Sequence, residues 1–304
     1  MSSCCYFICA PTATGKSSLA IRLAKKIGAS IVNADSMQVY SNLEILTARP
    51  SKSDHKEVEH LLYGYVKGFE RYNVVKWCRD ISNIINKFKK NNLPLVIVGG
   101  TGMYIKSLID GIIDVPVINE IYKQQSYNLL NKIGIESFIK EIKKFDSDSL
   151  NHISLNDTSR VRRIWEVYFA TGLSFTEWKE KKNKKYINNF NFKIFLFTPF
   201  REKIYENVNN RFKIMLKNGA IEEVEQLLKL KLDKSLPIMR AHGVPEISNY
   251  LNKIYNFEQC LDKGQQVTRN YVKRQLTWWR ASTLPIDQAF TVFPNDINEN
   301  LIKI

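Results

Sequence analysis

The chain opens with alternating elements that the spacing of apolar residues makes visible. Residues 5–9 form a short apolar run that is typical of a buried strand, and a loop of small residues follows it. Apolar residues then recur every fourth position, which predicts a helix over about 16–27, and a further apolar run predicts a strand at 29–33. Strand, loop, helix and strand in this order indicate the beginning of a βαβ unit.

The same alternation continues beyond the second predicted strand. A helical pattern over about 74–90 precedes the apolar run 95–98, which is typical of a central parallel strand and ends in Gly99-Gly100-Thr101-Gly102. Polar helical segments rich in Lys, Asn and aromatic residues follow, until an apolar run at 192–198 predicts a return to the sheet. The remaining chain predicts helices, with a Gly/Pro turn at 242–245 and a basic aromatic helix over 265–280.

These patterns predict an α/β fold with two parts. Residues 1–113 and 191–304 are expected to form a P-loop-containing parallel sheet with flanking helices, the second segment including the C-terminal helices. Residues 114–190 are expected to form an inserted helical subdomain. At 304 residues, the chain is long enough for both parts to bury a hydrophobic core.

Composition adds constraints on where the protein works. No apolar run is long enough for a membrane span, and the N-terminus lacks the basic region of a secretory signal. Five cysteines form no C-x-x-C pair, which fits a reducing compartment, so we expect a cytoplasmic protein without a membrane partner. The net charge of +15 is compatible with a polyanionic partner, but the position of the charge must decide.

The strongest motif lies between the first predicted strand and the first predicted helix. It reads Ala10-Pro11-Thr12-Ala13-Thr14-Gly15-Lys16-Ser17 and matches the phosphate-binding pattern G-x-x-x-x-G-K-[ST] except that Ala10 replaces the first glycine. Backbone N–H groups and the positive end of a helix dipole attract phosphate oxygens there. Lys16 adds a mobile charge, and the hydroxyl of Ser17 suits Mg²⁺.

The surroundings of this motif bear on the class of enzyme. Nucleotide hydrolases of the P-loop type usually have an apolar strand that ends in Asp, whereas the strand at 95–98 ends in glycines. Asp35 instead follows the strand at 29–33, at the sheet edge where open α/β sheets bind ligands. Asp35 is therefore a candidate base. An alternative is that it only caps a turn through its own backbone.

With these motifs, the chain resembles the tRNA dimethylallyltransferase family over nearly its whole length. This family is also called the tRNA isopentenyltransferase family. The sequence blocks that carry the resemblance stand in the expected order: 10–17, 33–40, 47–50, 95–104, 157–163 running into 170–172, Arg201, Arg211-Phe212, Gly243 and 271–278. The chain departs from the family pattern at Ala10, at Thr14 where Ser is commoner, and at Glu59-His60-Leu61 where the family has His-His before Leu.

The resemblance implies a reaction. A dimethylallyl group would pass from dimethylallyl diphosphate to the exocyclic amine of the adenosine on the 3′ side of the tRNA anticodon. Thr12, Lys16 and Ser17 would contact the diphosphate and Mg²⁺, and Arg201 would offer a planar donor fork to the leaving group. Asp35 would face the adenine amine, orient it and take its proton. The adenine would be flipped out of the anticodon loop into a channel that ends at the phosphate loop.

Residues expected to contact RNA fall into several groups. The resemblance implies contacts to the target nucleotide from Ser36, Met37, Gln38 and Thr101, and to a flanking backbone from Lys123. The sequence itself favours two basic segments with aromatic neighbours, whose members are Ser159, Arg160, Val161, Arg162 and Arg163 in the insertion and Arg269 and Lys273 in the last helix. The expected partner is the anticodon stem-loop of a tRNA, bound by a monomer.

Three other functions remain open from sequence alone. A small-molecule P-loop kinase would use Asp35 as a base toward a hydroxyl group, but it would not need the basic segments. An adenylate isopentenyltransferase would share the chemistry but act on a free nucleotide. A noncatalytic RNA-binding protein could retain an inactive phosphate loop, although the intact Lys16, Ser17 and Asp35 argue against it.

Overall fold

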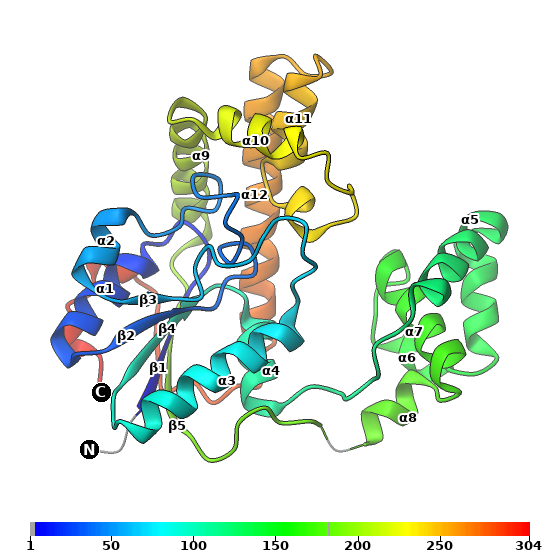
Figure 1. Ribbon diagram of the computed structural model, residues 1–304, viewed down its shortest axis with the longest axis horizontal. Helices are drawn as coiled ribbons and strands as arrows, with labels where there is room; N and C mark the ends of the chain where they lie inside the picture. The colour runs from blue at the N-terminus through cyan, green and yellow to red at the C-terminus, as the bar shows by residue number, and fades with distance from the viewer. Residues whose placement is uncertain (1–3, 182) are drawn as a thin grey trace. The chain divides into compact units, whose positions relative to one another are not determined.

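The computed structural model of the chain describes residues 4–181 and 183–304 and contains one parallel sheet (Figure 1). Its strands are β1 Cys4–Cys9, β2 Ser30–Asn33, β3 His60–Leu61, β4 Leu95–Gly99, β5 Asn191–Phe197 and β6 Gln288–Phe290. The strand order is β3-β2-β4-β1-β5-β6, and every pair is parallel. The carboxyl ends of β1, β2 and β4 therefore meet at the same edge.

Helices make up much of the rest of the described chain. They are α1 Lys16–Ile27, α2 Lys52–Glu57, α3 Val74–Lys90, α4 Gly102–Asp110, α5 Glu120–Lys143, α6 Ser147–Asn151, α7 Thr158–Thr171, α8 Phe175–Glu180, α9 Arg201–Lys217, α10 Ala220–Lys229, α11 Val244–Leu251 and α12 Phe257–Arg280. Short 3₁₀ turns lie at Pro237–Arg240, Pro294–Asp296 and Glu299–Leu301. None of the described helices is both long and apolar enough to cross a membrane.

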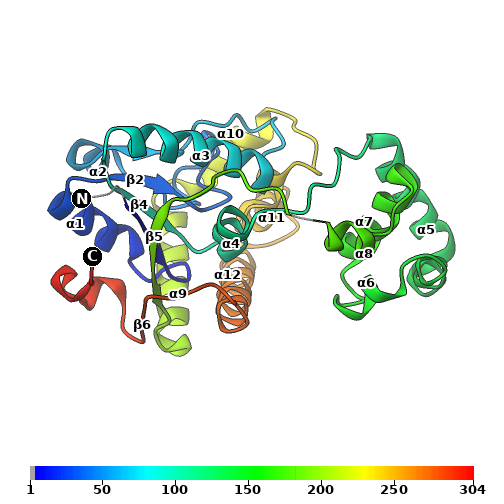
Figure 2. The same cartoon turned by 90° about the horizontal axis from the view of Figure 1, so that it is seen from below.

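The two faces of the sheet are covered by different helices, as Figure 2 shows for α1 and α3. Successive side chains of a strand point to opposite faces. Tyr6 and Ile8 of β1 accordingly share a core cluster with Leu19 and Leu23 of α1. On α3, the indole of Trp77 is fully buried and donates from Nε1 to the backbone oxygen of Asn33 at 2.8 Å. This bond fixes the end of β2, two residues before Asp35.

Helices α9 and α12 pack on each other beside the sheet edge. Ile204 and Val208 of α9 form a buried cluster with Val272 and Leu276 of α12. The helices approach closely because α12 carries a glycine: a Cβ built on Gly264 would lie 2.0 Å from the ring of Phe212. This packing places inward-facing residues of both helices next to the phosphate loop.

The chain divides into two compact units. One consists of the described residues up to Ile109 together with Tyr186–Ile304, and the other is Asp110–Lys185. The predicted insertion, 114–190, begins and ends a few residues later than this second unit. In the second unit, α5 and α7 surround a core that contains Phe138, Val161 and Trp165. The backbone of α5 breaks at Gly134, where φ is 74° and ψ is 166°, so α5 is two helices joined at a kink.

Most of the predicted elements lie where the apolar pattern puts them. The helix predicted over 16–27 is α1, and the one predicted over 74–90 is α3. The segment 242–245 was predicted as a turn, but α11 begins inside it at Val244, because a proline in the first helical turn lacks only an N–H that would have no partner there. The last helix begins at Phe257, before the predicted residue 265, and the three-residue strand β6 was not predicted.

Candidate active site

The phosphate loop connects the buried strand β1 to α1. The backbone turns through left-handed conformations at Ala13 (φ 61°) and Gly15 (φ 83°), and α1 begins directly afterwards at Lys16. The first N–H groups of a helix have no partner within the helix, so they are free to bind an anion. Ala10 is fully buried and is not among the residues with positive φ, so the missing glycine leaves the backbone path unstrained.

The side chain of Gln275, on α12, holds the phosphate loop by hydrogen bonds. Its Oε1 accepts the backbone N–H of Thr12 at 2.9 Å, and its Nε2 donates to the backbone oxygen of Gly100 at 3.0 Å. Inside the loop, the hydroxyl of Thr14 donates to the backbone oxygen of Pro11 at 2.8 Å. The buried amide of Gln275 thus ties the phosphate loop to the end of β4.

Two cations lie at this loop. Burial lowers the pKa of Lys16 to about 8, while the nearby Asp35 raises it and Arg211 lowers it further. Burial also lowers the pKa of Arg211 to about 10, partly offset by Asp35. The guanidinium of Arg211 donates from Nη2 to the hydroxyl of Thr12 at 2.5 Å. Within the described chain, neither cation forms an ion pair, so the loop holds positive charge without a carboxylate contact.

Arg211 contacts the phosphate loop but was not selected by the sequence analysis, which predicted that Arg201 offers a donor fork to the leaving group. Both residues belong to α9. Arg201 is the first residue of the helix and is exposed. The Nε of Arg201 lies 3.7 Å from Oε1 of Glu202, and its guanidinium lies over the ring of Tyr205. Arg211 lies almost three turns further along the helix and reaches the phosphate loop. The signal in the sequence was the Arg211-Phe212 pair, for which no role was proposed.

Asp35 forms a turn with one of its two carboxylate oxygens. Its Oδ1 accepts the backbone N–H of Met37 at 2.9 Å and that of Gln38 at 3.4 Å, which is a turn formed by an aspartate side chain. Its own N–H is bound by the buried side chain of Asn33. Among the described residues, Oδ2 receives no hydrogen bond. One oxygen therefore shapes the turn, and the other is available to a ligand.

A cleft of about 250 Å³ joins Asp35 to the phosphate loop. Its lining residues come from the loop, from the segment after β2, from α9 and α12, and from the turn before α11; they are Thr12, Asp35, Ser36, Met37, Leu46, Thr47, Val208, Arg211, Phe212, Met215, Arg240, Ala241, His242, Thr268, Tyr271 and Arg274. Thr12, Asp35, Ser36 and Met37, which the sequence analysis selected, are thus brought together. The side chain of Gln38 instead donates to the backbone oxygens of Thr47 and Ala48.

Basic and aromatic residues also line the cleft. Arg240 and Arg274 line it, and the ring of His242 lies 4.7 Å from that of Tyr271. Burial lowers the pKa of His242 to about 4, and the charge of Arg274 lowers it as well, so the imidazole is neutral at physiological pH. The sequence analysis described 242–245 only as a turn, because nothing in its local pattern indicates that the turn borders a cleft.

Comparisons with known proteins agree with this geometry. The family described as IPP transferase matches residues 38–282, and the one described as isopentenyl transferase matches residues 3–67. The tRNA dimethylallyltransferase of Bartonella tribocorum is 40% identical over 274 residues, which cover 90% of this chain and 93% of that protein. The corresponding protein of Wolbachia pipientis wMel is 39% identical over 88% of this chain and 89% of its own length. The chain belongs to the IPP transferase family.

Solved structures agree with the fold of this IPP transferase family member. The full-length tRNA isopentenylpyrophosphate transferase of Bacillus halodurans superposes with a TM-score of 0.66 and 25% identity, covering 96% of this chain and 90% of that one. A eukaryotic dimethylallyltransferase acting on tRNA has a TM-score of 0.80 at 24% identity, covering 97% of this chain and 75% of that one. The second likeness concerns the fold alone.

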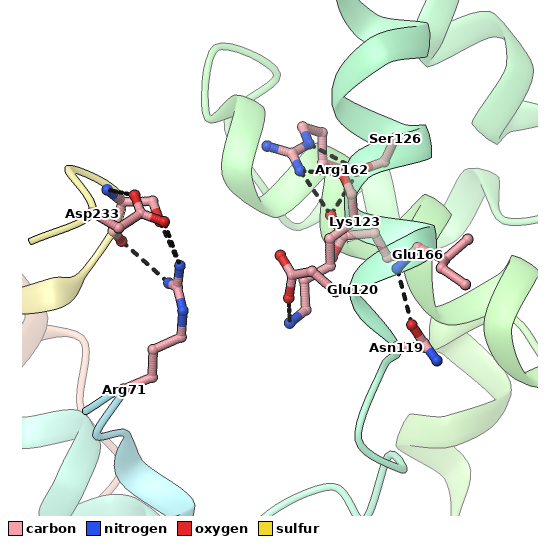
Figure 3. A network of polar contacts seen from close by, with 10 residues as sticks. Arg71, Asn119, Glu120, Lys123, Ser126, Arg162, Glu166 and Asp233 are labelled. Atoms are coloured by element: carbon pink, nitrogen blue, oxygen red, sulfur yellow. Dashed lines mark hydrogen bonds and ion pairs between the residues drawn. The ribbon is translucent and has the colours of Figure 1, made fainter. Parts of the chain in front are cut away.

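Several residues that were predicted to contact RNA have structural partners in this family member. In the second unit, Figure 3 shows the guanidinium of Arg162 directed at Ser126 and at the Lys123 backbone, to which it donates at 2.9 and 2.8 Å. The same group lies 3.2 Å from the buried Glu166. Arg162 therefore joins α5 to α7, and its planar fork is occupied. Val161 is fully buried and has no exposed surface for RNA.

The other predicted contacts in the second unit are more accessible. Arg160 is exposed, and its Nε lies 3.3 Å from Oδ2 of Asp157, which caps α7. Ser159 is exposed beside it. Arg163 is partly buried, and this burial lowers its pKa. Lys123 forms an ion pair with Glu120 at 2.8 Å on the surface. RNA contacts by these residues stay predictions.

In the first unit too, some of the predicted RNA contacts have protein partners and others are exposed. Arg269 donates to Oδ1 of Asn209 on α9 at 2.7 Å, so it joins two helices, while Lys273 is exposed. Thr101 directly precedes α4, and its Oγ1 is buried near Tyr271 but forms no hydrogen bond of good geometry with the described residues. Such a hydroxyl is a ready partner for a polar ligand atom.

The lowered pKa of Lys16 predicts how the affinity for inorganic diphosphate depends on pH. In the unliganded protein, Lys16 is protonated below about pH 8 and loses its proton above it. We expect affinity to fall as pH rises through 8, by up to about tenfold for each further pH unit. Because the pKa of His242 is about 4, it should add no step between pH 6 and 8.

Isothermal titration calorimetry from pH 6 to 9.5 measures this dependence. The ligand itself titrates in the same range, so the control is Lys16→Met, which keeps every other charge of the loop. We expect the variant to bind more weakly at pH 7 and to approach the wild-type affinity at pH 9.5. Parallel pH profiles for both proteins would contradict the assignment.

Proposed function

We propose that this chain transfers a dimethylallyl group from dimethylallyl diphosphate to the exocyclic amine of the adenosine on the 3′ side of a tRNA anticodon, releasing diphosphate. The observation that carries the proposal is that Arg211 and Asp35, a carboxylate with a free oxygen, line one cleft, and that Lys16 lies close to both of them at the phosphate loop. Lys16 and Arg211 suit the anionic leaving group, and Asp35 suits the amine. The names of the relatives support the same reaction.

The cations favour departure of the diphosphate. Negative charge grows on the leaving oxygen as the allylic C–O bond breaks, so groups that bind this charge stabilise the transition state more than the ground state. Lys16 and the first N–H groups of α1 face the terminal phosphate in this proposal, and Arg211 with Thr12 holds the phosphate on the side of the cleft. Because both cations are desolvated, their attraction for the new charge is strong.

Asp35 serves the other reactant. The lone pair of an exocyclic adenine amine is delocalised into the ring, so the nitrogen becomes more nucleophilic when an N–H is hydrogen-bonded to an anion. Oδ2 of Asp35 accepts that N–H and takes the proton as the new C–N bond forms. Oδ1 remains bound to the backbone of Met37, which keeps the carboxylate in place during the reaction.

The proposed metal is Mg²⁺, and the donors of the site fit a metal that is bound mainly through the substrate. The hydroxyl of Ser17 stands in the first turn of α1 beside Lys16. The described residues contain no group of three or more His, Cys, Asp or Glu side chains that could hold a metal by themselves. Mg²⁺ commonly keeps several waters and binds substrate phosphates, where it supplies positive charge to the leaving group.

A P-loop kinase is disfavoured by the end of β4. A Cβ at Gly99 would lie 2.3 Å from the backbone oxygen of Ala34, and one at Gly100 would lie 2.3 Å from Nε2 of Gln275. Neither position has room for the strand-end aspartate that holds Mg²⁺ in many nucleotide hydrolases. The exposed Arg160 and Lys273 favour tRNA over a free nucleotide as the acceptor. We also infer that the protein acts as a monomer in the cytoplasm.

The proposed reaction is tested with purified protein, Mg²⁺, labelled dimethylallyl diphosphate and unmodified tRNA. We expect labelled isopentenyl-adenosine after digestion of the tRNA. Transfer to free adenosine monophosphate instead would favour an adenylate isopentenyltransferase. ATP turnover without transfer would favour a kinase.

The role of Asp35 predicts a large effect from a small change. Asp35→Asn keeps an oxygen for the Met37 N–H but removes the charge that accepts the proton, so kcat should fall by about 10²–10⁴-fold while tRNA binding survives. Single-turnover rates at saturating substrates measure this, with thermal unfolding as the control for the turn. A chemical step within about threefold of wild type, worth less than 1.4 kcal/mol of barrier, would exclude a base at this position.

The two arginines of α9 offer a matched comparison. Arg211→Ala should lower kcat/KM for dimethylallyl diphosphate by about 10²-fold or more, because it removes a desolvated donor at the leaving group. Arg201→Ala, the same substitution in the same helix, should stay within about threefold. Steady-state kinetics at saturating tRNA decide between them. A larger loss in Arg201→Ala than in Arg211→Ala would instead assign the contact with the leaving group to Arg201.

A further inference from the structure

A carboxylate outside the cleft binds the backbone of one of its walls. Glu223 lies in the first turn of α10. Its Oε1 accepts the backbone N–H of Glu44 at 2.5 Å and that of Ile45 at 2.8 Å, and its Oε2 accepts that of Leu46 at 3.0 Å. Three successive backbone N–H groups thus converge on one carboxylate, an arrangement that proteins commonly use to bind anions.

The bound segment is also held at its other end, from the side of Asp35. Gln38 closes the turn that Asp35 begins, and its buried amide donates to the backbone oxygens of Thr47 at 2.8 Å and Ala48 at 2.9 Å. The hydroxyl of Thr47 donates to the backbone oxygen of Leu43 at 2.8 Å. The segment 43–48 is therefore fixed between Glu223 and the Asp35 turn.

Two residues of this segment, Leu46 and Thr47, line the cleft together with Asp35. Leu46 is only 9% exposed, and its side chain packs beside Gly243, where an added Cβ would lie 2.7 Å from Cδ2 of Leu46. The side chain therefore has little room to move as long as its backbone stays bound. The position of this wall depends on the N–H groups that Glu223 accepts.

We propose that Glu223 is a positioning residue for transfer to tRNA, which holds Leu46 and Thr47 as the rigid wall against which the acceptor base is placed beside Asp35. This inference rests on the proposed function. Glu223 lines no part of the cleft and touches no reacting atom, so its effect passes through the backbone of 44–46. Loss of its charge loosens the acceptor side of the cleft and leaves the phosphate loop unchanged.

The test compares Glu223→Gln with Glu222→Gln. The two residues are adjacent and carry the same charge, but Glu222 is exposed and makes no hydrogen bond to the segment 43–48 in the described chain. In Glu223→Gln an amide NH₂ faces backbone N–H groups that need an acceptor. We expect the KM for tRNA to rise about tenfold and the KM for dimethylallyl diphosphate to stay within about twofold. Glu222→Gln should match the wild type in both.

A merely structural role would give a different result. Partial unfolding lowers the active fraction and hence kcat, but it leaves both KM values unchanged. A KM for tRNA within about twofold of that of Glu222→Gln would therefore overturn the inference. Amide hydrogen exchange should rise in the segment 43–48 of Glu223→Gln, and unchanged exchange there would overturn it as well.

A second variant covers the case that Glu223→Gln fails to fold. Leu46→Ala removes the wall and keeps the carboxylate, so it should raise the KM for tRNA to a similar extent. Where both variants fold, the double variant should be no worse than the worse single one, because both act on the same wall; additive effects would overturn the inference. Absence of transfer by the wild type would refute the proposed reaction itself, and exchange in 43–48 would still decide whether Glu223 holds the segment.

Discussion

The candidate site depends on one buried amide, that of Gln275. Its two hydrogen bonds tie α12 to the N–H of Thr12 in the phosphate loop and to the oxygen of Gly100 at the end of β4. A buried amide that loses one partner leaves an unsatisfied group, which costs about 1–3 kcal/mol. Both bonds therefore tend to form together or not at all. This constraint brings the last helix, which supplies Tyr271 and Arg274 to the cleft, against a sheet edge formed by the first hundred residues.

The positive charge of the chain is used in two distinct ways. At the phosphate loop, Lys16 and Arg211 are desolvated and lack ion pairs among the described residues, so their charge is available to an anionic ligand. On the surface, Arg160 and Lys273 remain hydrated and suit the screened, salt-dependent attraction of an RNA backbone. Arg162 belongs to neither group, because Ser126, Glu166 and the backbone of Lys123 occupy its guanidinium. Net charge alone could not make this distinction.

Local pattern was sufficient for four strands of the sheet, β1, β2, β4 and β5, and for the phosphate loop. The helix α1 and the strands β1 and β4 follow from apolar spacing, and the parallel arrangement brings Asp35 to the same edge as the phosphate loop. Residues supplied by tertiary packing were not accessible in this way. Arg201 and Arg211 are ten positions apart on one helix, which turns their side chains about 80° away from each other, and only the packing of α9 on α12 decides which one faces the loop.

Similar limits explain why the sequence did not reveal the surroundings of other residues. Val161 sits in a basic run, yet the period of α7 directs it into the core of the second unit. His242 borders the cleft because α11 begins beside it, a fact that depends on contacts distant in the sequence. Arg269 was selected as an RNA contact from its place in a basic helix, and only the fold shows that it also donates to Asn209 of α9. Hydrogen-bond partners, unlike periodicity, cannot be read from spacing along the chain.

Two carboxylates of this chain illustrate how partners determine roles. Glu223 and Asp35 both accept backbone N–H groups near the cleft, and each fixes a turn. Both oxygens of Glu223 accept N–H groups of the segment 44–46, and Glu223 does not line the cleft, so it acts on the wall and not on a substrate. In Asp35, only Oδ1 accepts the N–H groups of its turn. A carboxylate can both be held rigidly and react only when its two oxygens divide these tasks, and in the cleft of this chain Asp35 meets that condition.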